Sequence, residues 1–172
     1  ISIIEEIQKR YASIIDIPRM LEGYALEEYS TSTSSCPLAA NMFSIPKEDW
    51  EAQLKRGREE MRKVFGREPM GFWPPEMAFC MDLIPALKKS GYEYVVIDGV
   101  HVRSKRPSTR EETLYQPHIA EYEGFEIIVI PRDRDLSNAQ ESGLNPEWFA
   151  NEVRSKTAGC KKPSLVTTWS DG

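Results

Sequence analysis

Two segments near the start of the chain place apolar residues at helical spacing. The first runs from Ser2 to Ile15, and its apolar positions recur three and four residues apart, which predicts an amphipathic helix. The second begins at Ile45-Pro46 and ends at Gly66, and its apolar face consists of Trp50, Leu54, Met61, Val64 and Phe65. Proline is tolerated in the first turn of a helix, and glycine adopts the left-handed conformation that often ends one. We therefore expect a second helix between these two residues.

Four short stretches rich in β-branched and aromatic residues predict strands: Met70–Trp73, Tyr92–Ile97, Phe125–Ile130 and Leu165–Trp169. Two further helices are expected between them. One is Leu83–Ser90, capped by Asp82 and closed by Gly91, and the other starts at Asn145-Pro146 and ends near Gly159. The charged stretch Arg103–Glu112 contains a proline and is expected to be a loop, as is the Ser/Thr run Ser30–Ser35. Strands that alternate with helices are typical of an α/β fold with mostly parallel strands.

The charge balance and the cysteine spacing narrow the possible classes of protein. The chain has 172 residues, about one domain, with 22 basic and 27 acidic residues and a net charge of −5. An acidic chain lacks the basic surface with which proteins bind nucleic acid or anionic membranes, so neither partner is expected. No apolar run is long enough to span a membrane. The widely spaced Cys36, Cys80 and Cys160 fit a reducing compartment and predict a cytoplasmic location.

An acidic residue follows each of the four predicted strands. These residues are Glu76, Asp98, Asp133 and Asp171. Functional groups of α/β folds collect at the carboxyl ends of parallel strands, so we expect the four carboxylates to converge as a shared acidic site. Each one alone also has a structural interpretation, because aspartate after a strand is ordinary turn chemistry.

The stretch from Gly71 to Glu76 restricts its own backbone. Pro74 and Pro75 fix consecutive φ angles and keep the preceding residues extended. A rigid strand exit would hold the Glu76 carboxylate at a fixed point, as a nucleophile that attacks a sugar carbon requires, and Trp73 could stack on a sugar face. The alternative is a tryptophan packed in the core beside a surface glutamate.

Two carboxylates can carry out glycoside hydrolysis, one as the nucleophile and the other as general acid and base. The second group needs a raised pKa, and Asp171 follows Val166 and Trp169, apolar neighbours of the kind that raise a carboxyl pKa. The sequence contains none of the motifs GxxxxGK[ST], GxGxxG and GxSxG, so it predicts neither a phosphate-binding loop nor a serine nucleophile elbow. His101 and His118 are too far apart for a two-histidine metal site on one helix. We expect His101 to line the site and His118 to lie in a loop.

These residues resemble the signatures of glycoside hydrolase family 57. Gly71–Glu76 is similar to the family's third signature, a Gly-x-Trp-x-Pro-Glu type stretch that carries the nucleophile. Leu165–Gly172 resembles the start of the fourth signature, an apolar strand leading to Asp-Gly-Glu, and Arg132–Ser137 is similar to a segment that many members carry between the two. The resemblance covers Pro46–Gly172. The family's first signature, His-Gln-Pro, is missing, and Cys36 stands where the second usually has a histidine.

The resemblance implies both a fold and an activity. The fold is part of a (β/α)7-type barrel with mostly parallel strands, incomplete in this chain, which would form a single partial catalytic domain over residues 1–172. The activity is that of a retaining hydrolase or transglycosylase of α-glucans, of the α-amylase or 4-α-glucanotransferase type, with an oligo- or polysaccharide substrate. Glu76 would be the nucleophile and Asp171 the acid/base, and the sugar site would be lined by Trp73, Asp98, His101, Asp133 and Trp169. No metal and no organic cofactor is expected.

Two other interpretations stay open. A relative of the same fold could bind carbohydrate, or serve a structural role, without catalysis. A metal-dependent sugar deacetylase has a similar barrel, and the shortage of histidines argues against it. In every case the open barrel implies a covering surface, either the missing part of the same chain or another copy in a homo-oligomer.

Overall fold

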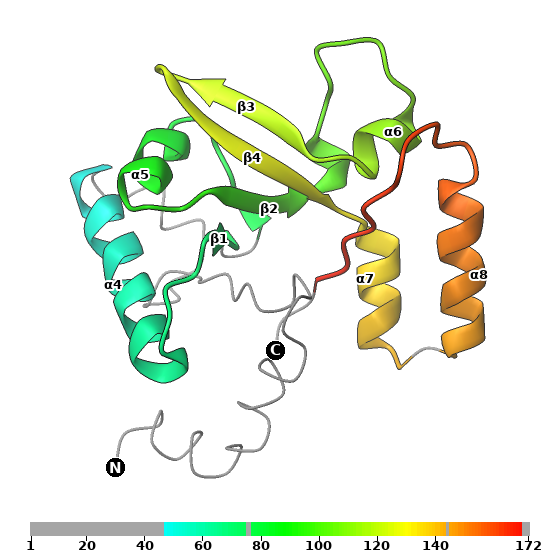
Figure 1. The fold of residues 1–172 in the computed structure, drawn as a ribbon, viewed down its shortest axis with the longest axis horizontal. Helices are drawn as coiled ribbons and strands as arrows, with labels where there is room; N and C mark the ends of the chain where they lie inside the picture. Colours follow the sequence, from blue (N-terminus) through cyan, green and yellow to red (C-terminus); the bar gives the residue numbers. More distant parts are fainter. Residues whose placement is uncertain (1–46, 75–76, 144, 170–172) are drawn as a thin grey trace. The chain divides into compact units, whose positions relative to one another are not determined.

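Residues 47–74, 77–143 and 145–169 are described by the computed structural model, in which the chain forms two units, residues 1–93 and 94–172 (Figure 1). The predicted helix Ser2–Ile15 and the loop Ser30–Ser35 lie outside the described residues. Glu76 and Asp171 lie outside them as well. The two units are considered separately below.

The first unit confirms the helix between the proline and the glycine. Helix α4 (Lys47–Phe65) buries Trp50 and Leu54 on one face, with exposed fractions of 4% and 1%. Gly66 follows with φ of +77°, and its N–H donates to the Arg62 carbonyl at 2.8 Å. The left-handed glycine thus ends the helix as the sequence predicts.

Strand β1 (Gly71–Phe72) and helix α5 (Leu83–Lys89) complete the described part of the first unit. Phe72 and Tyr92 are fully buried and meet edge to face, with ring centroids 5.4 Å apart. The Tyr92 hydroxyl donates to the Leu54 carbonyl at 3.2 Å and so joins this pair to α4. The strand predicted for Tyr92–Ile97 therefore begins two residues too early, because Tyr92 packs in the core of the first unit.

The cap predicted for α5 is wrong in its chemistry. Asp82 occupies the cap position but has helical backbone angles, and its side chain makes no capping hydrogen bond. The N–H groups of Leu83 and Ile84 donate instead to the carbonyls of Cys80 and Met81. Gly91, with φ of +89°, closes the helix as predicted.

Two parallel strands form the centre of the second unit. Strand β2 (Tyr94–Asp98) pairs with strand β4 (Phe125–Arg132), and the register runs from Tyr94 opposite Ile128 to Asp98 opposite Arg132. Val95, Val96, Ile127 and Val129 are buried, which accounts for the apolar character of both stretches. The parallel arrangement predicted for these two stretches is confirmed, and β4 continues through Pro131, where its end was expected.

A hairpin strand that the sequence analysis did not predict lies beside β4. Strand β3 (His118–Tyr122) runs antiparallel to it, from His118 opposite Val129 to Tyr122 opposite Phe125 (Figure 1). The turn consists of Glu123 and Gly124, with φ of 51° and 77°, the signs that a tight hairpin turn needs. His118 is therefore in a strand, where its Nε2 lies 2.7 Å from the Thr113 carbonyl, and the loop expected for it is wrong.

Helices make up much of the rest of the second unit. The 3₁₀ helix η3 (Gly99–His101) follows β2, and α6 (Arg110–Leu114) occupies the end of the stretch expected to be a loop. Helix α7 (Arg134–Glu141) was not predicted, whereas α8 (Pro146–Thr157) begins after Asn145 as expected. The Asn145 side chain accepts hydrogen bonds from the N–H groups of Glu147 and Trp148. Helices α7 and α8 lie side by side (Figure 1).

The strand predicted for Leu165–Trp169 is not formed. The Leu165 N–H donates to the Tyr115 carbonyl, the Thr167 carbonyl accepts from Asp133 N–H, and the Trp169 N–H donates to Ser137 Oγ. These partners belong to three different places in the unit, so no ladder forms along one neighbour. The α/β class is nevertheless confirmed.

Candidate active site

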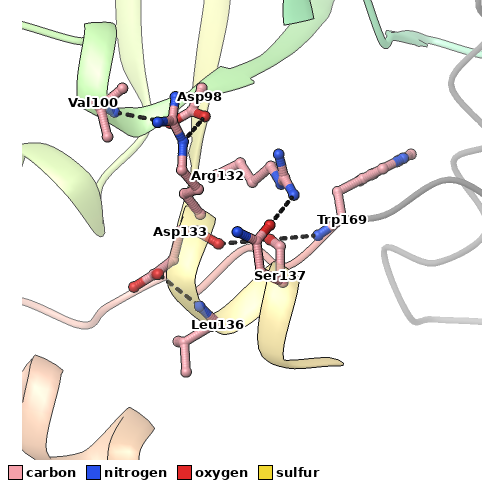
Figure 2. A network of polar contacts seen from close by, with 9 residues as sticks. Asp98, Val100, Arg132, Asp133, Leu136, Ser137 and Trp169 are labelled. Atoms are coloured by element: carbon pink, nitrogen blue, oxygen red, sulfur yellow. Dashed lines mark hydrogen bonds and ion pairs between the residues drawn. The ribbon is translucent and has the colours of Figure 1, made fainter. Parts of the chain in front are cut away.

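The carboxyl ends of β2 and β4 meet at one edge of the sheet. Asp98 is the last residue of β2, and its register partner Arg132 is the last residue of β4. Asp133 follows directly and caps α7 (Figure 2). The structure thus brings two of the four predicted carboxylates to a shared edge, as parallel pairing requires.

Asp98 is a buried carboxylate with two partners. Its Oδ1 accepts from Val100 N–H at 3.1 Å, which caps η3, and its Oδ2 accepts from Arg134 Nε at 2.6 Å. Only 4% of the Asp98 side chain is exposed, against 47% for Arg134. The buried acid is thus neutralised by an arginine that keeps about half of its surface in solvent.

Gly99 allows η3 to pack tightly beside this pair. A Cβ placed on Gly99 would lie 2.1 Å from Leu114 Cδ1 and 2.9 Å from the Arg132 carbonyl oxygen. Only glycine fits so close to the backbone at the end of β4. The Asp98-Gly99 pair therefore fixes both the carboxylate and the path of the chain beyond β2.

Asp133 has more partners within the fold than Asp98. Its Oδ1 accepts from the Leu136 N–H at 3.0 Å, and its Oδ2 accepts from the Tyr115 hydroxyl at 2.7 Å. Lys156 Nζ of α8 lies 3.4 Å from the same Oδ2. One carboxylate thus joins the chain after α6 to the start of α7 and to α8.

These contacts shift two pKa values in opposite directions. Burial alone would raise the pKa of Asp133, but the Leu136 N–H, the Tyr115 hydroxyl and Lys156 outweigh it and hold that pKa below its usual value. Burial, and then the hydrogen bond to the Asp133 carboxylate, raises the pKa of the Tyr115 phenol. Asp133 is therefore a structural anion, and its predicted contact with sugar stays a prediction.

Trp169 is tied to α7 through a buried serine. Ser137 is fully buried, and its hydroxyl donates to the Asp133 carbonyl and accepts from the Trp169 N–H at 3.1 Å (Figure 2). The Asp133 N–H donates in turn to the Thr167 carbonyl at 2.9 Å. The first turn of α7 therefore fixes the backbone from Thr167 to Trp169, two residues before Asp171 in the sequence.

Two of the other predicted site residues lie within the described ranges. His101 is exposed at the end of η3, and Trp73 lies half-buried after β1 in the first unit. The acid pair itself, Glu76 and Asp171, lies outside the described residues, so its separation stays a prediction.

Two arginines at the edge were not singled out from the sequence. Arg132 is buried, with 9% of its surface exposed, and its Nη2 lies 3.4 Å from Asn138 Oδ1, while Arg134 binds Asp98. Their position in the Arg-Asp-Arg-Asp run after a strand was the available signal. Within the described ranges no group of three or more His, Cys, Asp and Glu could hold a metal ion. No described helix is long and apolar enough to cross a membrane.

Comparison with known proteins identifies the family. The family model of glycosyl hydrolase family 57 matches residues 2–167. An α-amylase of Pyrococcus furiosus is 34% identical over 134 residues, which cover 78% of this chain and 20% of the relative. The crystal structure of a 4-α-glucanotransferase from Thermococcus litoralis is 26% identical with a TM-score of 0.71, over 96% of this chain and 25% of that chain.

The fold is also similar to that of a protein described as a deacetylase. A structure described as that of a polysaccharide deacetylase from Mycobacterium smegmatis matches this chain at 15% identity and a TM-score of 0.59. The match covers 94% of this chain and 54% of the deacetylase chain. That likeness concerns the fold only. The chain spans a fifth of the amylase and a quarter of the glucanotransferase, so it holds an incomplete part of the barrel. Because the family model matches nearly the whole length of the chain, the chain belongs to glycosyl hydrolase family 57.

Proposed function

We propose that this protein is a retaining glycoside hydrolase or transglycosylase that acts on α-glucans. The observation that carries the proposal is the match of residues 2–167 to the family, which includes the Gly71–Glu76 stretch. The similarity to a protein described as an α-amylase and to one described as a 4-α-glucanotransferase supports α-glucans as the substrate class.

In the proposed mechanism Glu76 attacks the anomeric carbon of a glucosyl residue. Asp171 protonates the leaving oxygen, and a covalent glycosyl-enzyme forms. Asp171 then deprotonates a water or a sugar hydroxyl, whose oxygen attacks the anomeric carbon and releases the Glu76 carboxylate. Water gives hydrolysis, and a sugar hydroxyl gives transfer. Trp73 and Trp169 stack on sugar faces, and Asp98 and His101 line the same site. No metal or organic cofactor takes part in these steps.

The described edge supports this proposal through its geometry. Asp98 and Asp133 lie together at the carboxyl ends of parallel strands, the side on which α/β barrels place their active sites. The bonds from Ser137 and Asp133 hold the segment that leads to Asp171. A preorganised approach to the acid/base is what positioning catalysis needs.

The proposal also concerns the surroundings of the protein. The chain is proposed to act in the cytoplasm, with the remaining part of the same protein, or a second copy, covering the open side of the barrel. Only a chain that includes this cover is expected to be fully active.

The test uses the full-length enzyme and maltooligosaccharides. Replacement of Glu76 by Gln keeps the shape and removes the nucleophile, so turnover is expected to fall by at least ~10³-fold, while Glu126→Gln on the exposed face of β4 leaves it unchanged. Asp171→Asn is expected to spare the release of activated leaving groups, which needs no acid, and to slow the second step, in which Asp171 is the base. The first products should keep the α configuration in proton NMR spectra.

Three results would count against the proposal. Unchanged turnover in Glu76→Gln would remove the nucleophile assignment, and inverted products would remove the retaining mechanism. Binding of maltooligosaccharides with no turnover would favour the non-catalytic alternative.

A further inference from the structure

The chain just beyond β2 carries only positive charge. Between Gly99 and Arg110 there is no aspartate or glutamate, and Arg103, Lys105, Arg106 and Arg110 are all exposed. Four of the 22 basic residues thus fall within eight positions of a chain whose net charge is −5. We call residues 102–110 the basic loop. Its sign is opposite to that of the protein as a whole.

The cations of the basic loop are not used by the fold. Within the part of the chain that the structure describes, no carboxylate forms an ion pair with any of these four side chains. In the same unit, Arg134 pairs with Asp98 and Lys156 with Asp133. Of the two acids that follow the loop, Glu112 accepts from the Thr109 N–H in a capping box, and Glu111 lies in the first turn of α6.

The basic loop is anchored at both ends. At its start, Asp98 holds the Val100 N–H, and Gly99 packs against Leu114 of α6. At its end, Thr109 accepts from the Glu112 N–H at 3.1 Å, and the hydroxyls of Ser108 and Thr113 are 2.8 Å apart. The loop leaves η3 and returns to α6 as a projecting arch (Figure 1). A loop with fixed ends loses less conformational entropy when it binds a ligand.

The basic loop begins at the edge that carries the candidate active site. It follows η3 at the carboxyl end of β2, where Asp98, four residues before the loop, binds Arg134. The carboxylates of Asp98 and Asp133 are already paired with cations of the same unit, Asp98 with Arg134 and Asp133 with Lys156. A ligand that approaches this edge of the unit therefore meets uncompensated positive charge.

We propose that the basic loop binds phosphate ester groups carried by the α-glucan substrate. The inference rests on the proposed function, because it takes the glucan to be bound at the same edge. Guanidinium groups bind phosphate oxygens through two parallel hydrogen bonds, and lysine adds a mobile charge. A neutral glucan offers hydroxyls alone, whereas a phosphate monoester on one glucose supplies the anion that the loop fits. The loop would thereby favour phosphorylated stretches of a glucan over neutral ones.

The test compares two ligands on the full-length enzyme. One is neutral maltoheptaose, and the other is maltoheptaose with one phosphate monoester. Calorimetric titration of the full-length Glu76→Gln enzyme, which should bind both ligands without turning them over, is expected at low salt to give a dissociation constant roughly tenfold lower for the phosphorylated ligand. The difference should shrink as the salt concentration rises, because exposed charges are screened.

A matched pair of variants assigns the effect to the loop. The triple variant Arg103→Gln, Lys105→Gln, Arg106→Gln should lose the preference and keep its turnover of neutral maltoheptaose. The control Lys55→Gln, Arg56→Gln, Lys63→Gln removes the same charge from α4 of the other unit and should keep the preference. Thermal unfolding of both variants checks that they fold.

The outcomes separate the two proposals. No turnover of neutral maltoheptaose by the wild type would refute the proposed function. Turnover with equal affinity for both ligands, or a preference that survives in the loop variant, would refute this inference alone. Equal competition by a short DNA or polyphosphate would show a general anion-binding loop and would also overturn it.

Discussion

At the scale of single residues, Asp98 and Asp133 differ in the partners that their carboxylates bind. Asp98 accepts from one backbone N–H and from a half-exposed arginine, whereas Asp133 accepts from a backbone N–H, a phenol and a lysine. The first arrangement presents a cation to solvent beside the site. In the second arrangement, groups inside the fold bind both carboxylate oxygens. Asp98 with Arg134 is therefore better placed than Asp133 to meet a substrate.

Asp133→Asn is expected to destabilise the protein at neutral pH by about 1–3 kcal/mol, because it weakens a buried charged hydrogen-bond network. The folded pKa of Asp133 is lowered, so its contribution is complete above the ordinary aspartate pKa of about 4 and is lost as the pH falls below that value. Urea unfolding should show a constant gap between wild type and variant from pH 7 to about pH 4, and a gap that closes as the pH falls from there to pH 3.

Asp135→Asn serves as the control for that experiment. Asp135 also lies within 3.5 Å of Lys156, but 83% of its side chain is exposed. It should cost little stability at any pH. A gap that stays constant down to pH 3 for Asp133→Asn would show that the charge of Asp133 does not stabilise the fold.

The sequence identified these acids but could not assign their roles. Asp98 and Asp133 both follow apolar stretches, and the position at a strand end is visible in the sequence. Their partners are Arg134, Tyr115 and Lys156, which are 18 to 36 residues away along the chain. Only the folded arrangement of α6, α7 and α8 brings these groups together, so periodicity alone could not distinguish a cap from a ligand.

At the scale of elements, α7 connects the fold to the candidate active site. Its cap Asp133 and its buried Ser137 together hold the backbone of Thr167 and Trp169. The sequence analysis missed this helix because Arg134–Glu141 is mostly polar, with Leu136 as its one large buried side chain. The hairpin strand β3 was missed for another reason: its burial alternates, but the exposed positions include apolar Ile119 and the half-buried ones include His118, so the sequence does not reveal the alternation.

Ser137→Ala is expected to reduce turnover of maltooligosaccharides more than it changes KM. The substitution removes the acceptor of the Trp169 N–H and so loosens the segment that leads to the proposed acid/base. The loss of stability should be about 1–2 kcal/mol. Steady-state kinetics and thermal unfolding of the full-length enzyme measure the two effects.

Ser142→Ala, at the C-terminal end of the same helix, is the matched control. The Ser142 hydroxyl also donates to a carbonyl four residues back, that of Asn138 at 3.0 Å, but it is exposed. Its loss should leave both stability and turnover close to wild type. Equal kinetic effects of the two substitutions would rule out a positioning role for Ser137.

At the scale of the whole molecule, the family could be read from the sequence more fully than the fold could. The signature Gly71–Glu76 identified the family, and the match to its model over residues 2–167 confirms this. The strand predicted for Leu165–Trp169 did not form, because its backbone bonds go to three separate places. The pairing of that segment depends on its neighbours in space, which local sequence does not specify.

The order of strands in the second unit has a consequence for how the chain folds. β3 and β4 are joined by the turn at Glu123 and Gly124. Tyr94 of β2, by contrast, is 34 residues away along the chain from its register partner Ile128 in β4. Local contacts close faster than distant ones, so we expect the hairpin to form first and to act as the template on which β2 docks. Pulse-labelled hydrogen exchange during refolding should protect the amides of Ala120 and Ile127, which lie opposite each other in the hairpin, before that of Val96. Gly124→Val, which cannot adopt the turn without strain, should slow refolding more than it speeds unfolding.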